Sequence, residues 1–268
     1  MVNWIEAAAL ALIQGFSEFL PVSSSAHLVL PSQLLGWNDQ GLFFDVVVHF
    51  GTLLAVLFYF RRDLISLLPT AFSSKGVPNW QGELWMIVLA TMPVILAGYL
   101  AAGLISQEFR GLAVIATTTL VFGMLLGVSV IRSERISTIS APISWRAALF
   151  IGFAQIFALI PGVSRSGITI TAGLWLGYEP KAATRFSFLL SIPVILGAIS
   201  FMLVEALGGI ESPPADWSIL AFALIAAAVS AYFTIAFFFR LIDRIGLMPF
   251  VWYRLALGIV LFGIVFIQ

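Results

Sequence analysis

Long apolar runs dominate the chain, and six of them approach the roughly 20 residues that a helix needs to cross a bilayer. Polar positions gather in the short segments between these runs. The pattern predicts an all-α polytopic membrane protein. The expected crossing helices are Leu42–Phe60, Glu83–Ile105, Gly111–Ile131, Thr184–Val204, Trp217–Phe239 and Met248–Ile267.

Two further apolar runs are interrupted before they could cross. Trp4–Leu35 is broken at Pro21 and the serines that follow it, and Arg146–Tyr178 is broken at Pro161 and Gly162. Non-helical backbone at membrane depth is tolerated only where it is buried in protein or lines a water-filled cavity. Each run is therefore predicted to be a re-entrant helical hairpin with a polar tip.

The two interrupted runs also resemble each other. "EFLPVSSSAHL" and "ALIPGVSRSGIT" share an apolar approach, a proline and a serine-rich turn that opens a second helix. Each is followed by three of the expected crossing helices, so the second half would be inverted relative to the first. The pattern predicts one membrane domain over residues 1–268, built as an inverted-topology repeat of about 1–131 and 132–268.

Composition supports this class and excludes others. Of the 268 residues 61% are hydrophobic and 10% are charged, with a net charge of zero, so nothing favours a nucleic-acid partner. The absence of cysteine excludes disulfides and thiolate metal sites. No Lys or Arg precedes the first apolar run, and Glu18 interrupts it, so we expect mature protein there rather than a signal peptide.

Basic residues in the loops predict the orientation. If the first hairpin enters from outside, the inside loops hold ten basic residues and the outside loops hold one, Arg110. Because cytoplasmic loops carry the excess of Lys and Arg, both termini are expected outside, and the second hairpin is expected to enter from the cytoplasm. The inside residues are Arg61, Arg62, Lys75, Arg132, Arg135, Arg146, Lys181, Arg185, Arg240 and Arg244; Glu205, Glu211 and Asp216 lie in outside segments.

The first hairpin carries an amide and a carboxylate in its first helix. Gln14 and Glu18 are four residues apart, so they share one helix face. Ionisable residues inside a membrane are energetically costly and mark functional sites. The alternative is that Glu18 has no further role than an ion pair with an arginine. Asn3 and Glu6, at the start of the same helix, have the spacing of a structural capping box.

After Pro21 the first tip supplies hydroxyls and an imidazole. Ser23, Ser24 and Ser25 stand where a new helix begins, and His27 follows on the side of Ser23 and Ser24. A helix N-terminus offers unpaired N–H groups and a positive dipole end that suit an anion. The alternatives are that the serines only cap the helix and that His27 is an interfacial histidine with satisfied hydrogen bonds.

The second tip adds a cation and more hydroxyls: Ser164, Arg165, Ser166 and Thr169. The planar guanidinium of Arg165 suits phosphate oxygens, although it could instead snorkel or neutralise Glu18. If the tips meet, they form a site for a phosphate-like group. Mg²⁺ or Ca²⁺, held partly by Glu18 with Gln14 as a neutral ligand, would reconcile the carboxylate with a phosphate.

The roles of three other polar residues remain open at this point. Asp45 and His49, four apart in an expected crossing helix, could form a pair that supports the cavity. Arg254 in the last helix could snorkel or support the site.

These residues together resemble a known family, the undecaprenyl-diphosphate phosphatases of the bacitracin-resistance type. That family carries "(E/Q)xxxE" running into "FLPVSSxGHL", and a second motif "PGxSRSGxT". Here they stand as "QGFSEFLPVSSSAHL" (Gln14–Leu28) and "PGVSRSGIT" (Pro161–Thr169). The flanking "FDVVVHFGTLLAV" and "ATRFSFLLSIPV" and the chain length are also similar, so the resemblance covers essentially the whole chain.

The resemblance implies a fold of six crossing helices and two re-entrant hairpins. It implies removal of the terminal phosphate of the C55 isoprenyl diphosphate, giving undecaprenyl phosphate for recycling of the cell-wall lipid carrier. The implied place is the bacterial cytoplasmic (inner) membrane, with the site opening to the periplasmic or outer face among membrane lipid. Bacitracin would compete for the substrate and resistance to it would follow; a homodimer is allowed but not required.

Residue roles follow from motif position. The implied metal-linked pair is Gln14 and Glu18, and the implied hydroxyl and imidazole pair is Ser24 and His27. The implied phosphate-binding set is Arg165, Ser164 and Thr169. Their place in the tips adds three further substrate-binding candidates: Ser23, Ser25 and Ser166. Two positions depart from the family. Gln14 leaves a two-carboxylate metal site in doubt, and Ala26 stands where glycine is common, which leaves less room for left-handed backbone there.

Two functions from different classes remain at this stage. In a phosphatase, Ser24 or a water molecule attacks the terminal phosphorus, and His27 is a general base or a proton donor to the leaving group. In a lipid-carrier flippase or transporter, the same tips form an anion-binding site at the midplane, because broken helices in inverted repeats are transporter architecture. A membrane scaffold would need neither Glu18 nor Arg165 inside the bilayer.

Overall fold

The structure, a computed structural model, describes residues 3–37, 42–70, 82–108, 111–136, 138–208 and 216–267, and over these residues it is helical apart from one isolated β-bridge between Ile139 and Tyr178. The helices are α1 Trp4–Ser17, α2 Ser24–Leu35, α3 Leu42–Tyr59, α4 Arg61–Thr70, α5 Glu83–Glu108, α6 Leu112–Ser133, α7 Trp145–Ile156, the 3₁₀ turn η1 Phe157–Leu159, α8 Arg165–Trp175, α9 Pro180–Gly208, α10 Trp217–Ile245 and α11 Met248–Ile267.

Five of the described helices, α5, α6, α9, α10 and α11, are long and apolar enough to cross a membrane. A sixth span exists if α3 and α4, which meet at a 67° bend, are counted as one. The all-α membrane protein that the sequence predicts is thereby confirmed in its coarse form. The finer arrangement of six crossings and two re-entrant hairpins stays a prediction.

Both interrupted runs are broken where the sequence predicts. α1 ends at Ser17 and α2 begins at Ser24; α7 ends at Ile156, and η1 and a turn precede α8. The capping box at the start of α1 is also present, because Asn3 accepts from the backbone N–H of Glu6 at 2.9 Å and Glu6 accepts from that of Asn3 at 3.0 Å. Glu6 therefore has the structural role expected of it.

α10 extends six residues beyond the expected Trp217–Phe239 and ends at Ile245. The expected span stops just before Arg240, and charges are costly in hydrocarbon. A helix needs only its own backbone hydrogen bonds, so it continues into the polar end of the molecule.

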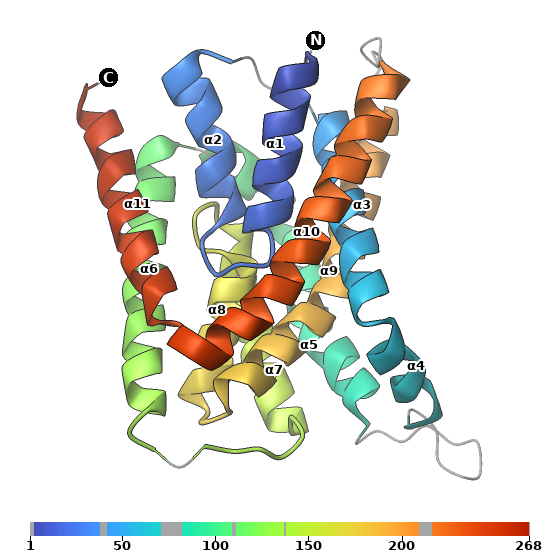
Figure 1. The fold of residues 1–268 in the computed structure, drawn as a ribbon, viewed down its shortest axis with the longest axis vertical. Coiled ribbons are helices and arrows are strands. Elements are labelled where there is room, and N and C mark those ends of the chain that lie inside the picture. Colours follow the sequence, from blue (N-terminus) through green and yellow to red (C-terminus); the bar gives the residue numbers. More distant parts are fainter. Residues whose placement is uncertain are drawn as a thin grey trace.

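In Figure 1, α1 and α2 lie side by side in the upper half, and the loop that joins them lies near mid-height; α7 and α8 lie below. α1 packs on α10, and α7 packs on α5. In each pair a glycine allows the backbones to meet, since a Cβ at Gly15 would lie 2.6 Å from the carbonyl oxygen of Ala227, and one at Gly152 would lie 2.6 Å from that of Ala90. Such close approach through small residues is typical of helix packing in membranes.

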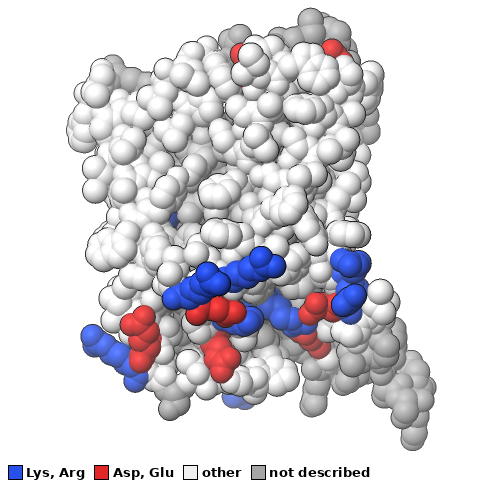
Figure 2. Space-filling view, viewed as in Figure 1, with Lys and Arg blue, Asp and Glu red and all other residues white. Residues whose placement is uncertain are grey.

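The charged side chains of the face drawn in Figure 2 gather at the end that holds α4, and the middle of that face is almost free of them. Ion pairs lie at the same end: Arg185 contacts Asp63 at 2.8 Å and also Glu83, and Lys181 contacts Asp243 at 2.9 Å. Of the loop charges used to predict the orientation, Lys75, Arg110 and Glu211 lie outside the described residues.

Candidate active site

Each tip begins its second helix with a serine in a strained conformation. Ser23 at the N-cap of α2 has φ 74° and ψ 101°, and Ser164 at the N-cap of α8 has φ 69° and ψ 111°. Among the described residues, these are the only non-glycine residues with positive φ. Such conformations cost about 1–3 kcal/mol each and cluster at functional sites. The two tips therefore share one local backbone geometry.

Both tips also repeat one hydroxyl contact. The Oγ atoms of Ser23 and Ser25 are 3.2 Å apart in the first tip, and those of Ser164 and Ser166 are 3.2 Å apart in the second. The preceding residues, Val22 and Val163, are both buried. Aligned on these contacts, Ser24 of the first tip corresponds to Arg165 of the second.

The tips are in direct contact through reciprocal hydrogen bonds. The backbone N–H of Gly162 donates to Ser25 Oγ at 2.9 Å, and Ser166 Oγ donates to the carbonyl oxygen of Leu20 at 2.9 Å. A serine of each tip thus makes a hydrogen bond to a backbone group of the other tip. Gly162 and Leu20 are both buried, and buried backbone groups outside a helix need such partners because water does not reach them.

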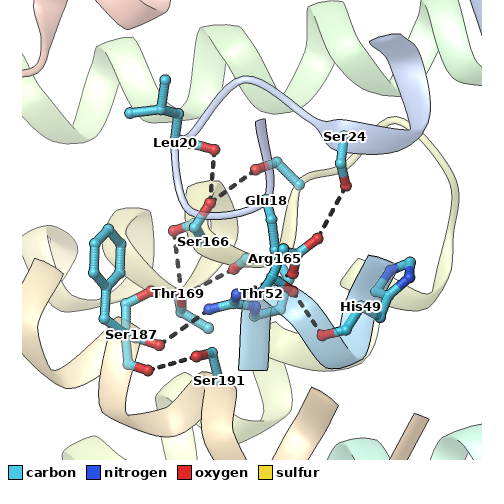
Figure 3. A network of polar contacts seen from close by, with 12 residues as sticks. Glu18, Leu20, Ser24, His49, Thr52, Arg165, Ser166, Thr169, Ser187 and Ser191 are labelled. Atoms are coloured by element: carbon cyan, nitrogen blue, oxygen red, sulfur yellow. Dashed lines mark hydrogen bonds and ion pairs between the residues drawn. The ribbon is translucent and has the colours of Figure 1, made fainter. Parts of the chain in front are cut away.

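Glu18 contacts side chains from both motifs (Figure 3). Its Oε1 accepts from Arg165 Nη2 at 3.2 Å, and its Oε2 accepts from Gln14 Nε2 at 3.0 Å and from the Ser24 hydroxyl at 3.3 Å. The side chains of Arg165 and Glu18 are only 11% and 9% exposed, so the ion pair is shielded from water. The structure therefore brings together four candidates from both motifs.

A serine of α9 contacts two residues of the second tip. Arg165 Nη1 donates to the carbonyl oxygen of Ser187 at 3.1 Å, and the hydroxyls of Thr169 and Ser187 are 2.7 Å apart. Thr169 Oγ1 also donates to the carbonyl oxygen of Arg165 at 2.9 Å. Thr169 therefore links the backbone carbonyl of Arg165 to Ser187. Ser187 was not singled out from the sequence, although it lies in the flanking stretch "ATRFSFLLSIPV".

His27 contacts a residue that the sequence did not single out. Its Nδ1 lies 2.7 Å from the carbonyl oxygen of Ser23, and its Nε2 lies 2.6 Å from the hydroxyl oxygen of Tyr253 on α11. The two rings stack with an interplanar angle of 2°. The hydroxyl of Ser24 donates to Glu18 instead. Ser24 and His27 are therefore not hydrogen-bonded to each other in the part of the chain that the structure describes, although they were expected on one side of the helix.

Arg254, the residue after Tyr253, contacts the second tip. Arg254 is fully buried, donates from Nε to the carbonyl oxygen of Thr119 at 3.3 Å and from Nη2 to that of Gly162 at 3.0 Å. Its Nη1 has no hydrogen-bond partner among the described residues. Of the two roles left open for Arg254, the structure supports contact with the site, because a snorkelling arginine would reach water.

The charges of this region favour an anion. Glu18, Arg165 and Arg254 together carry one net positive charge, and the N-termini of α2 and α8 add the positive ends of two helix dipoles. The Ser164 hydroxyl accepts from the N–H of Gly167 at 3.1 Å, which is the capping role considered for it, whereas Ser23 makes no such bond at α2. The first-turn N–H groups of α2 are therefore not occupied by their N-cap side chain.

Comparison with known proteins agrees with the motifs. Residues 7–260 match the family described as bacitracin resistance protein BacA. The chain belongs to this family. A relative from Alcanivorax borkumensis, named undecaprenyl-diphosphatase, is 52% identical over 97% of this chain and 98% of its own. Another from Pseudoalteromonas translucida, named undecaprenyl-diphosphatase 1, is 49% identical over 95% of this chain and 96% of its own.

The oxygen atoms around Glu18 suit the divalent cation that the family resemblance implies. Gln14 is fully buried, and its Oε1 has no hydrogen-bond partner among the described residues. Hard divalent cations take carboxylate and amide oxygens as ligands. The described residues contain no cluster of three or more His, Cys, Asp and Glu side chains, so the protein would supply few ligands, as is common for Mg²⁺ bound together with phosphates.

Two smaller expectations concern α2 and α3. Ala26 is buried within α2 and packs against α6 and α11, so the positive φ of this tip falls on Ser23 and left-handed backbone is not needed at Ala26. His49 Nδ1 lies 2.7 Å from the backbone carbonyl oxygen of Asp45. This contact joins the His49 ring to the helix backbone rather than to the Asp45 carboxylate.

Proposed function

We propose that the protein is a membrane phosphatase that removes the terminal phosphate of undecaprenyl diphosphate and gives undecaprenyl phosphate for recycling of the cell-wall lipid carrier. The observation that carries this proposal is the contact of Glu18 with both Arg165 and Ser24 inside two joined tips. It sets a hydroxyl, a carboxylate and a guanidinium around one point. The family and the names of the two relatives support the same reaction and substrate.

Within this proposal the chain's own residues bind and orient the diphosphate. Arg165 and the N–H groups that open α2 and α8 hold phosphate oxygens, with Ser23, Ser25, Ser164 and Ser166 near them. Glu18 orients the Ser24 hydroxyl, Thr169 bonds the backbone carbonyl of Arg165, and the carbonyl oxygen of Ser187 accepts from its guanidinium. Preorganised donors of this kind stabilise the charge that develops in phosphoryl transfer.

Two routes of attack remain, and they differ in what can be trapped. If Ser24 attacks the terminal phosphorus, a phosphoseryl enzyme forms and water then releases phosphate; if water attacks, Ser24 only binds. Mixing purified protein with substrate labelled in its terminal phosphate and quenching with acid distinguishes them. Label that stays on the protein, and is lost in Ser24→Ala, supports the covalent route.

A divalent cation completes the proposed site. Glu18 and Gln14 would hold Mg²⁺ or Ca²⁺, which would neutralise phosphate charge and polarise the bond to the leaving group. The buried carboxylate could then approach the phosphate without repulsion.

The proposed setting is the bacterial inner membrane, with six crossings, two re-entrant hairpins in an inverted repeat, and a site open to the periplasmic side. The matched geometry of the two tips supports the repeat. The gathering of basic side chains at one end supports the orientation. Bacitracin would compete with the protein for the same lipid diphosphate. Whether the protein forms a homodimer can be tested by measuring its mass in detergent.

The direct test is phosphate release from undecaprenyl diphosphate by purified protein in detergent. Because there is no second compartment, a transporter alone would release no phosphate. We expect release that depends on a divalent cation and on Glu18 and Arg165. Absence of release by the folded wild-type protein with Mg²⁺ or Ca²⁺ would contradict the proposed function.

A lipid flippase is the second candidate, favoured by the reciprocal bonds that join the two tips. Breaking them on one side would open the site toward one leaflet, which is how alternating access works around a midplane site. Transfer of labelled undecaprenyl phosphate between leaflets of proteoliposomes, measured with a hydrolysis-inactive variant, would separate this activity from the phosphatase.

A further inference from the structure

His27 is a histidine whose two ring nitrogens are both engaged. Nδ1 lies 2.7 Å from the carbonyl oxygen of Ser23, which can only accept, so Nδ1 must carry a proton. The histidine is then either neutral, with Nε2 as an acceptor, or cationic, with Nε2 as a donor. In both states Nε2 faces the hydroxyl of Tyr253 at 2.6 Å.

This contact keeps the imidazole from acting directly on another group. The ring is packed parallel to that of Tyr253, which fixes its plane, and the Ser23 carbonyl fixes its rotation. The Ser24 hydroxyl donates to Glu18. Any proton that His27 takes or gives in this geometry therefore passes through the Tyr253 oxygen.

We propose that Tyr253 is the proton-relay residue through which His27 exchanges a proton with the diphosphate site. This inference rests on the proposed phosphatase function. A phenol suits the task because it has one proton and free lone pairs on the same oxygen. Beside a neutral His27 it donates to Nε2 and accepts from outside; beside a cationic His27 it accepts from Nε2 and donates outward.

The relay balances over the reaction. When water attacks the terminal phosphorus, one of its protons passes to the Tyr253 oxygen, and the proton of Tyr253 passes to His27 Nε2. The bridging phosphorus–oxygen bond breaks, and its electron pair stays on the prenyl phosphate. Returning the stored proton through Tyr253 to that oxygen restores neutral His27 and the phenol.

The position of Tyr253 on α11 supports a role at the site. The next residue, Arg254, donates to the Gly162 carbonyl oxygen of the second tip at 3.0 Å. Consecutive residues of one helix thus contact both tips. Tyr253 is 46% exposed, so part of this residue lies at the surface of the chain.

The test compares Tyr253→Phe, His27→Ala and the double variant in phosphate release by purified protein. Tyr253→Phe keeps the stacked ring and removes only the oxygen. General acid–base catalysis contributes about 100- to 10,000-fold, so we expect kcat to fall at least about 100-fold in each single variant. The double variant should lose no more, and KM should stay within about threefold because substrate binding is not the step affected.

Matched controls separate the relay from folding and from the phosphatase proposal itself. Tyr99→Phe on α5, where the side chain is 78% exposed, should leave kcat unchanged. The melting temperature of Tyr253→Phe should stay near that of wild type. A smaller loss in kcat, a loss confined to KM, or additive losses in the double variant would overturn the relay. Inactive wild-type protein would instead contradict the proposed function.

Discussion

Gly167 at the start of α8 lies directly against the guanidinium of Arg254 on α11: a Cβ built at Gly167 would stand 2.6 Å from Arg254 Nη1. The glycine of the second motif thus leaves room for an arginine that is distant in the chain. Because Arg254 is fully buried and is held by carbonyl oxygens of Thr119 and Gly162, it has little freedom to move aside.

Gly167→Ala is therefore expected to impair the protein even though alanine favours helices. Overpacking of a filled interior typically costs about 1–3 kcal/mol, and the displaced Arg254 would pull on the Gly162 carbonyl of the tip. We expect a lower melting temperature. We also expect phosphate release to fall at least about tenfold, which corresponds to a rise of about 1.4 kcal/mol in the activation free energy. Gly263→Ala on α11, with nothing within 4 Å, is the control and should change neither. Wild-type behaviour of Gly167→Ala would contradict the packing described.

The ion pair of Glu18 and Arg165 should show separable effects on stability and activity. Removing one partner of a buried pair leaves the other charge unpaired and typically costs about 3–5 kcal/mol. Glu18→Gln and Arg165→Met are each expected to lower the melting temperature and to abolish measurable phosphate release. The double variant should regain part of the stability and none of the activity.

The comparison for this ion pair is Lys181→Met at the exposed contact with Asp243, where the two side chains are 60% and 52% exposed. Exposed pairs are typically worth about 0–1 kcal/mol, so activity and melting temperature should hardly change. If the double variant at Glu18 and Arg165 regained phosphate release together with stability, the pair would be structural only.

Both reciprocal bonds between the tips should be needed for a fixed site. Ser25→Ala leaves the N–H of Gly162 without its partner. Ser166→Ala removes the bond from the second tip to the carbonyl oxygen of Leu20, which still accepts from the N–H of Val22 at 2.8 Å. An unsatisfied buried polar group costs about 1–3 kcal/mol. We expect both variants to melt earlier and to turn over more slowly. Ser32→Ala, which removes a bond within α2 to Val29, should keep wild-type turnover.

Metal dependence should respond to the residue at position 14. A chelator is expected to abolish phosphate release, and Mg²⁺ or Ca²⁺ should restore it. Gln14→Glu gives the site a second carboxylate, which strengthens binding of hard cations. The half-saturating cation concentration should then fall, and the cation should raise the melting temperature more than in wild type. An unchanged cation requirement in Gln14→Glu would mean that this residue is not a ligand.

The first tip illustrates what the sequence could predict about the site. Glu18 inside an apolar run, Pro21 after it and serines at a helix start are local signals, and they correctly indicated a broken helix with a polar end. Local spacing also places Ser24 and His27 on one side of their helix, but residues on one side of a helix need not bond to each other. In the structure Ser24 meets Glu18 across the turn, and His27 turns toward α11.

The order of apolar runs and breaks, the chemistry of the two motifs and the family could all be inferred from the sequence alone, since run length, proline and helix spacing act within a few residues. Only the tertiary structure decided that His27 meets Tyr253, 226 residues later, that Arg254 reaches Gly162, and that Ser187 supports Thr169. Those contacts depend on how helices from distant parts of the chain are rotated and shifted against each other. Packing of many side chains at once sets that geometry, and no local pattern carries it.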